Sequence, residues 1–352
     1  MKYSTNKSFC EELDQKDSLK SYKDLFFIPK NKQGKELIYF CGNSLGLQPK
    51  KTKEYIIQEI DDWKTLAVEG HFRAKNPWLP YHEMLSTSYS KLIGAKSSEV
   101  IAMNTLTVNL HLMMVSFYKP EKNKFKILIE KDAFPSDIYA VESQIKFHGF
   151  KADEALIKLE PRKGEYYIRQ EDIEKIIKEN SNEIALILIG GVNYYTGQLF
   201  DMQKITKVGH EHGIVVGFDL AHAIGNVKLE LNKWNVDFAV WCSYKYLNSG
   251  PGAIAGAFVN ERFHNVELPR FTGWWGHNKK ERFLMDDKFK PIKSAEGWQL
   301  SNPPIFSLAP VFASLSIFDK VGMDDLIKKS KALTNYLEFL IKSIDNKNIE
   351  II

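Results

Sequence analysis

The sequence has few cysteines and no long apolar run, and both shortages exclude whole classes of protein. Only three cysteines occur in 352 residues, Cys10, Cys41 and Cys242. This odd, widely spaced set fits neither a disulfide framework nor a zinc site. No apolar stretch is long enough to cross a bilayer, and the polar N-terminus lacks the apolar core of a secretory signal. We therefore expect a cytoplasmic protein that does not associate with a membrane.

A dominant charge of one sign is also lacking. The chain has 48 lysine and arginine residues against 44 aspartate and glutamate residues, and the two signs are mixed along its whole length. No basic stripe is interleaved with aromatic residues, so the pattern indicates a solvated surface and no nucleic-acid partner. The composition, 44% hydrophobic and 26% charged, is typical of a globular protein with room for one large and one smaller domain.

From about residue 95, short apolar runs alternate with amphipathic segments. The pattern predicts strands at 126–130, 155–159, 184–190, 214–220, 237–242 and 253–259, and helices at 136–147, 170–180 and 202–213. Apolar strands between such helices predict an α/β fold, a mostly parallel sheet with helices on both faces. Residues 310–344 are typical of two further helices, and 346–352 of the beginning of a strand.

An acid and a lysine stand at the ends of two predicted strands. Asp219 ends the run IVVGF, and Lys245 follows the next run in WCSYKYLNSG. Ligands gather at the carboxyl ends of parallel strands. Pyridoxal phosphate needs a carboxylate that keeps its ring nitrogen protonated and an amine that forms a Schiff base. A turn acid and a surface lysine are the ordinary alternatives, but the pairing, with His222 spaced to hydrogen-bond Asp219, favours the cofactor site.

Two further segments offer groups for such a cofactor. The backbone N–H groups of Leu106 and Thr107, at a predicted helix start, would hold a phosphate, although an ordinary N-cap explains the same pattern. In the segment FPSD, Phe134 is suited to stacking on a flat ring and Asp137 to orienting a ring substituent; a turn with an N-cap is the alternative.

Other segments are less specific. The loops FTGWWGHN and WQLSNPPIFS carry Trp274, Trp275, Ser301 and Asn302, which are suited to lining a pocket for an aromatic substrate. The glycine-rich segment NSGPGAIAGAF leads into a strand, whereas a dinucleotide fingerprint opens a helix, so a nicotinamide dehydrogenase is disfavoured. His210 and His212 have no third ligand cluster, so no metal site is expected.

With these segments together, the chain resembles the kynureninases, pyridoxal-phosphate enzymes of the aspartate-aminotransferase fold type. The matching segments are YFCGNSLGLQP, EGHF, MNTLTVNLHLMM, FPSD, GVNYYTGQ, VGFDLAHAIGNV, WCSYKYLNSGPG, GWWGH and SNPPI, in the family's order from about residue 36 to 320. The resemblance implies hydrolysis of L-kynurenine, or its 3-hydroxy form, to an anthranilate and L-alanine. The implied reaction proceeds through a ketimine and cleaves the Cβ–Cγ bond of the substrate. The implied pathways are tryptophan catabolism and NAD biosynthesis.

The resemblance also implies roles for single residues. Lys245 would form the Schiff base, Asp219 would pair with the ring nitrogen, and Tyr244 would contact the phosphate and later transfer a proton. The implied cofactor site comprises Leu106, Thr107, Phe134, Pro135, Ser136, Asp137, Asp219, His222, Tyr244, Lys245, Trp274 and Asn302, and the implied contacts to the aryl part of the substrate are His71, Ser301 and Asn302. Because Trp274 and Asn302 serve the site across a dimer interface in this family, a homodimer with shared active sites is implied.

The chain departs from the family pattern at two points. Gly190 stands where some members have a small hydroxyl residue near the phosphate, so one hydrogen bond is expected to be missing. No arginine follows Arg282, whereas the family's arginine for the substrate carboxylate lies in the C-terminal domain. We therefore expect 1–70 to contribute to a small domain, 71–304 to form the large cofactor-binding domain, and 305–352 to begin a small domain whose C-terminal part is missing.

Two other functions stay open at this point. Another pyridoxal-phosphate enzyme of the same fold type, such as a cysteine desulfurase-like lyase, would need a reactive cysteine on a mobile loop, and none of the three cysteines is suitably placed. A non-catalytic binding or scaffolding protein built on an enzyme fold is the alternative from a different class. The presence of Lys245, Asp219 and Tyr244 argues against it.

Overall fold

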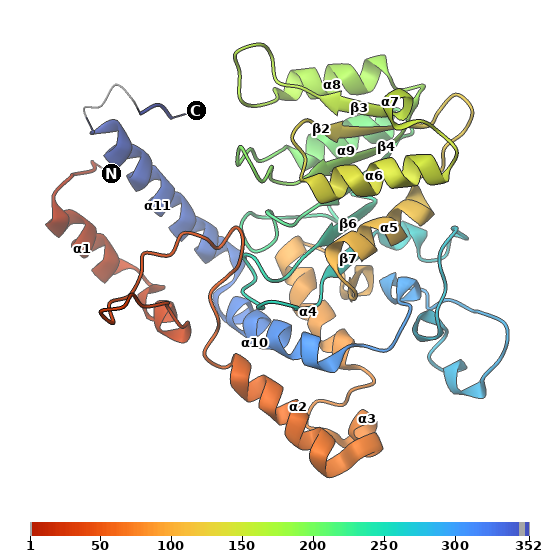
Figure 1. Ribbon diagram of the computed structural model, residues 1–352, viewed down its shortest axis with the longest axis horizontal. Coiled ribbons are helices and arrows are strands. Elements are labelled where there is room, and N and C mark those ends of the chain that lie inside the picture. The colour runs from red at the N-terminus through yellow and green to blue at the C-terminus, as the bar shows by residue number, and fades with distance from the viewer. Residues whose placement is uncertain (1, 345–348, 352) are drawn as a thin grey trace.

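A seven-stranded sheet forms the centre of the molecule (Figure 1). The computed structural model describes residues 2–344 and 349–351. The strands are β1 Val100–Ala102, β2 Lys126–Glu130, β3 Leu156–Leu159, β4 Ile184–Gly190, β5 Val215–Asp219, β6 Phe238–Trp241 and β7 Gly256–Val259. Their order is β1-β7-β6-β5-β4-β2-β3, with parallel pairs from β6 to β3 and antiparallel pairs around β7. The predicted α/β class with a mostly parallel sheet is confirmed.

Helices precede, separate and follow the strands. The α-helices are α1 Lys7–Lys16, α2 Thr52–Leu66, α3 Gly70–Arg73, α4 Tyr81–Ile93, α5 Leu106–Phe117, α6 Pro135–Phe147, α7 Ala152–Ala155, α8 Gln170–Glu179, α9 Met202–Glu211, α10 Ile305–Val321 and α11 Met323–Lys342. Short 3-10 turns lie at Lys20–Leu25, Ala67–Glu69, Ser97–Glu99, Glu261–Phe263, Trp274–Gly276, Arg282–Leu284 and Ala295–Trp298.

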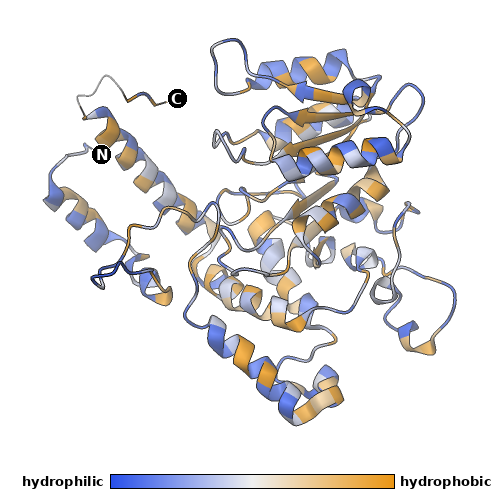
Figure 2. Cartoon of the chain, viewed as in Figure 1, coloured by the Kyte–Doolittle hydropathy of each residue, from blue (hydrophilic) through white to orange (hydrophobic). Residues whose placement is uncertain are grey.

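The strands alternate their side chains between two apolar cores. In β2, Leu128 joins the core on the face covered by α4, α8, α9 and α10, whereas Ile127 and Ile129 join the core beneath α5 and α6. Successive side chains of a strand point to opposite faces, so a strand covered on both sides must be apolar throughout. Figure 2 shows this pattern, with apolar strands inside and polar outer faces on the helices.

The sequence-based element predictions hold with small shifts at the ends. The helix predicted at 136–147 begins one residue earlier, with Pro135 as its first residue, a position that proline favours because it has no N–H to leave unpaired. The strand predicted at 253–259 begins only at Gly256, after Gly250 and Gly252 adopt positive φ angles of 82° and 77° in a turn. Strand β1, three residues long, was not predicted.

The C-terminal predictions are confirmed in part. The two expected helices are α10 and α11. The strand expected at 346–352 lies outside the described residues except for 349–351, which have no regular secondary structure. Among the described residues, no single helix has the length and apolarity to cross a membrane; α10 and α11 pass that test only together, with a bend of 82° between them.

Candidate active site

Three neighbouring parallel strands end at the same edge of the sheet. β5 ends at Asp219, β4 at Gly190 and β2 at Glu130, and Asp219 is the register partner of Gly190. The loop after β6 adds Tyr244 and Lys245 to the same place. Chain segments far apart in sequence therefore meet at the carboxyl ends of the strands, where open α/β sheets bind ligands.

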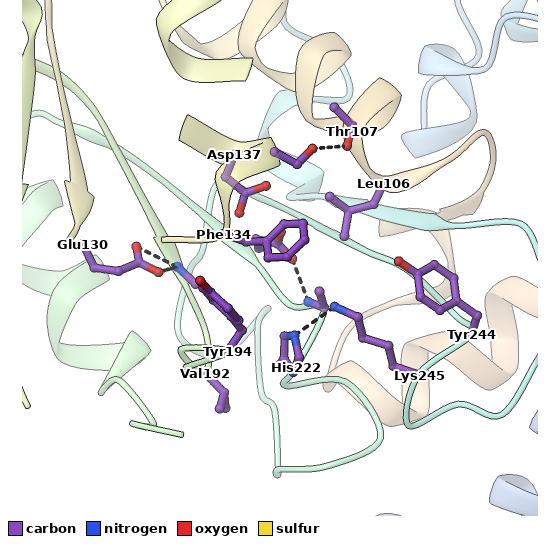
Figure 3. A pocket seen from close by; sticks show the side chains of 14 residues that line it. Leu106, Thr107, Glu130, Phe134, Asp137, Val192, Tyr194, His222, Tyr244 and Lys245 are labelled. Carbon is purple, nitrogen blue, oxygen red and sulfur yellow. Dashed lines mark hydrogen bonds between the residues drawn. The ribbon is translucent and has the colours of Figure 1, made fainter. Parts of the chain in front are cut away.

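These groups line an open hollow (Figure 3). Its walls are Leu106, Thr107, Glu130, Phe134, Ser136, Asp137, Gly190, Val192, Tyr194, Asp219, Ala221, His222, Tyr244 and Lys245. Most of the residues expected at the cofactor site are present. The sequence reasoning did not assign Glu130, Val192, Tyr194 and Ala221 to the site. The sequence pattern could have identified Glu130 as a site residue, because it is a charged residue at the end of an apolar strand, as Asp219 is.

Lys245 faces His222 across the pocket. The Nζ atom of Lys245 lies 2.9 Å from Nε2 of His222. Burial, with a smaller contribution from the charge of Lys245, lowers the pKa of His222 to about 4. His222 is therefore neutral at pH 7 and accepts a hydrogen bond from the lysine. The expected bond between His222 and Asp219 is wrong, because Asp219 turns back onto its own chain and accepts the backbone N–H of Ala221 at 2.7 Å.

Three buried carboxyl groups form one end of the pocket, called the acid end below: Glu130, Asp137 and Asp219. Their side chains make no salt bridge among the described residues, and Oδ1 of Asp137 has no hydrogen-bond partner. Burial raises the pKa of all three, that of Glu130 to about 7. Asp219 raises the pKa of Asp137 further, so we place the proton on Asp137 and the charge on Asp219.

Hydroxyl groups and helix starts form another part of the pocket wall, called the hydroxyl end below. Leu106 and Thr107 begin α5, and Ser136 lies in the first turn of α6. The hydroxyl oxygens of Thr107 and Ser136 are 2.8 Å apart. Tyr244 lies on this side of the view in Figure 3, across from Glu130. Burial raises the pKa of Tyr244 to about 12, so it keeps its proton and can donate a hydrogen bond. N-terminal N–H groups and hydroxyls suit a phosphate.

The pocket residues fit pyridoxal phosphate on three independent observations. The carboxylate of Asp219, to which no cation is bonded in the part of the chain that the structure describes, suits a protonated ring nitrogen, because buried carboxylates are costly unless they are paired. The hydroxyl end suits the phosphate. Phe134 stands at the pocket wall, where its ring lies edge-on against Tyr194 with centroids 5.3 Å apart, and Lys245 Nζ is 5.7 Å from the Phe134 centroid.

Five residues of the expected site do not line this pocket. Pro135 begins α6 beside it. His71 lies on α3 against the ring of Trp78, with centroids 5.5 Å apart. Trp274 is 41% exposed and donates its indole N–H to the carbonyl of Arg282. Ser301 and Asn302 are exposed. The roles of these five stay predictions.

Comparison with known proteins gives a consistent result. A model of the class-V aminotransferase family matches residues 38–351. Curated kynureninases from Flavobacterium psychrophilum and Flavobacterium johnsoniae are each 55% identical to the chain; the first match covers 96% of the chain and 80% of the relative, the second 99% and 82%. A solved apo cysteine desulfurase from Thermococcus onnurineus NA1 has a TM-score of 0.67 at 18% identity, covering 96% of this chain and 78% of that one. That last likeness concerns the fold alone.

Proposed function

The chain belongs to the kynureninase family of the class-V aminotransferases, and from this premise we propose that it hydrolyses L-kynurenine, and its 3-hydroxy form, to the corresponding anthranilate and L-alanine. The observation that carries the proposal is that Lys245, the acid end and the hydroxyl end line one pocket. The reaction is hydrolysis of a carbon–carbon bond by an enzyme that depends on pyridoxal phosphate.

Each end of the pocket has a part in holding this cofactor. When bound, pyridoxal phosphate supplies an aldehyde that combines with amino groups and a ring that accepts electrons. Leu106, Thr107 and Ser136 would hold the phosphate with N–H and hydroxyl groups. Asp219 would hold the proton on the ring nitrogen, and Phe134 would cover the ring.

Proton movements fall to Lys245 and Tyr244. A neutral His222 orients Nζ of Lys245. Nζ is the group suited to take the α-proton of the bound amino acid once the amine is free. Tyr244 keeps its proton at neutral pH, so its Oη can deliver that proton to the β-carbon when the Cβ–Cγ bond breaks.

Tyr244→Phe should lower kcat by about 100- to 10,000-fold, the usual contribution of a positioned general acid or base. Binding of the cofactor should change less, because the hydroxyl end keeps its other donors. Steady-state kinetics with L-kynurenine measures the change. Tyr246→Phe is the matched control, since Tyr246 does not line the pocket. A rate within about threefold of the wild type would remove Tyr244 from the mechanism.

The reaction itself is tested with the purified chain and added pyridoxal phosphate. L-kynurenine should give anthranilate, followed by its fluorescence, and an equal amount of alanine. L-cysteine, offered in parallel, tests the desulfurase alternative. Cys242 is buried with its pKa raised to about 11, and neither Cys10 nor Cys41 lines the pocket, so sulfide release should be negligible. Sulfide without anthranilate would reverse the assignment.

We further propose that a second copy of the chain completes each site. Trp274 and Asn302 are exposed and lie outside the pocket of their own chain, which supports a role at the pocket of a partner subunit. The mass in solution, measured by sedimentation, tests the dimer. A cytoplasmic location and the division into 1–70, 71–304 and 305–352 belong to the same proposal.

A further inference from the structure

Glu130 is a buried acid in the pocket that the proposed chemistry does not use. It ends β2 and is 4% exposed. In the sheet, β4 separates β2 from β5, so Gly190 stands between Glu130 and Asp219. A carboxyl group this close to the charged Asp219, without a cation bonded to it among the described residues, needs a physical reason to be there.

The contacts of Glu130 hold the chain that follows β4. Its two oxygens share one donor, the backbone N–H of Gly190, at 3.1 and 3.2 Å. Three residues later, the amide of Asn193 donates to the carbonyl of Asp132, and the side-chain oxygen of Asn193 accepts the backbone N–H of Tyr195 and of Thr196. The end of β2 thus anchors both ends of residues 190–193, called the anchored turn below.

The anchored turn places aromatic and apolar groups in the pocket. Val192 lies within it and Tyr194 directly follows it, and both line the cavity. The ring of Tyr194 packs edge-on against Phe134 and lies 6.5 Å from the ring of His222, centroid to centroid. In Figure 3, Glu130 and Tyr194 both lie toward the flank away from Tyr244. If Glu130 were displaced, the anchored turn would move, and with it Val192 and Tyr194, which line the pocket proposed for the cofactor.

Gly190 leaves the space that Glu130 occupies. A Cβ atom at position 190 would lie 2.8 Å from Oε1 of Glu130, too close for both to stay in place. The expectation that this glycine removes a phosphate contact is therefore not supported by its position, which is at the acid end beside Glu130.

The charges around Glu130 favour its neutral form. Asp219 on β5 and Asp137 on α6 are acids in the same pocket, and Lys245 is bonded to His222 across the cavity. On the outer side, Lys131 is 3.8 Å from Glu160, after β3, and so is already paired. Burial is the main cause that raises the pKa of Glu130 to about 7, and the charge of Asp219 adds to it, whereas the N–H of Gly190 and the amide of Asn193 act in the opposite direction.

We propose that Glu130 acts as a positioning residue whose contact with the N–H of Gly190, and not its charge, fixes the anchored turn, leaving Asp219 as the anion of the acid end. The proposal rests on the proposed use of pyridoxal phosphate, because the ring nitrogen is the group that the remaining anion would serve. Glutamine reproduces the neutral acid in shape and acceptor oxygen, so Glu130→Gln should preserve what Glu130→Ala loses.

Two measurements test the proposal. The variants are Glu130→Gln, Glu130→Ala, Gly190→Ala and the control Glu160→Gln. The first is the affinity for pyridoxal phosphate at pH 7, followed by tryptophan fluorescence. We expect Glu130→Gln and Glu160→Gln to stay within about threefold of the wild type, and Glu130→Ala and Gly190→Ala to bind at least about tenfold more weakly. In Gly190→Ala only the flexible end of Glu130 must move, so this variant serves if Glu130→Ala does not fold.

The second measurement is the melting temperature of the cofactor-free chain between pH 5 and pH 8. A carboxyl whose pKa is near 7 in the folded state and near 4.5 when unfolded holds a proton that unfolding releases. Its contribution to stability is therefore present at low pH and is lost as the pH rises toward and past 7. Relative to the wild type, Glu130→Gln should lose this contribution, whereas Glu160→Gln should not. Asp137 and Asp219 add to the decline in every variant, and histidines whose pKa burial lowers, such as His222, act in the opposite direction in every variant.

Two results would overturn the proposal. One is a Glu130→Gln protein with native near-UV circular dichroism that loses as much cofactor affinity as Glu130→Ala, since charge and not contact would then matter. The other is an unchanged pH dependence of melting in Glu130→Gln, since the buried acid would then be ionised. Failure of the proposed function looks different: the wild type would not bind pyridoxal phosphate, while the melting comparison would still report on Glu130.

Discussion

Lys245→Ala should abolish the covalent attachment of pyridoxal phosphate to the chain and lower turnover by about 10,000-fold or more. Among the described residues, Lys245 contributes the one amine that lines the pocket. His222 cannot replace it, because an imidazole ring has no primary amine to condense with an aldehyde. After reduction with borohydride, intact-mass spectrometry should show one bound cofactor in the wild type and none in the variant.

Lys228→Ala is the matched control. Lys228 is an exposed lysine paired with Asp324 at 2.8 Å, away from the pocket. The Lys228→Ala variant should gain the mass of one bound cofactor and turn over at the rate of the wild type, because an exposed ion pair contributes little to stability. If Lys245→Ala still gained the cofactor mass, with a peptide map placing it at another lysine, the assignment of the pocket would fail.

Asp219→Asn should keep part of its cofactor and lose about 100- to 1,000-fold in kcat, the range for removing one preorganised electrostatic contact. Asparagine retains the shape and can still accept the backbone N–H of Ala221, the bond that fixes the side chain. It cannot hold a proton on the ring nitrogen, so the ring would accept electrons less well. The kinetics with L-kynurenine and the absorbance of the bound cofactor measure the two effects separately.

A second aspartate provides the control for this substitution. Asp201 caps α9 by accepting the backbone N–H of Lys204 at 3.0 Å, and asparagine caps a helix about as well as aspartate. Asp201→Asn should therefore leave kcat unchanged. Equal rates for Asp219→Asn and the wild type would mean that the charge at the acid end lies on a different carboxyl, and Glu130 and Asp137 would then be tested in turn.

Local sequence pattern was enough to predict most of the elements that build the site. β4 and β5 are apolar runs with a definite end, and α6 begins at a proline where the pattern indicates a helix start. A predicted strand boundary was wrong where a turn with positive φ angles at Gly250 and Gly252 precedes β7. The short strand β1 was missed because three residues are too few for periodicity to be detected.

Contacts between distant segments were predicted less well. His222 was expected to bond Asp219, its near neighbour in sequence, yet it faces Lys245, which is 23 residues away along the chain. Glu130 ends a strand just as Asp219 does, but its place in the pocket depends on β4 lying between β2 and β5 and ending in a glycine. Neither fact can be derived from the residues around Glu130.

The amino-acid sequence by itself determined the chemistry available to this protein and the class of its fold. Apolar periodicity is a local property, and so is the position of Asp219 or Lys245 at the end of a run. Only the tertiary structure decided which of these groups meet, because strand order and the direction of each side chain depend on packing across the whole sheet. It joined Glu130, Asp137 and Asp219 at one end of a pocket and left His71, Trp274 and Asn302 outside it.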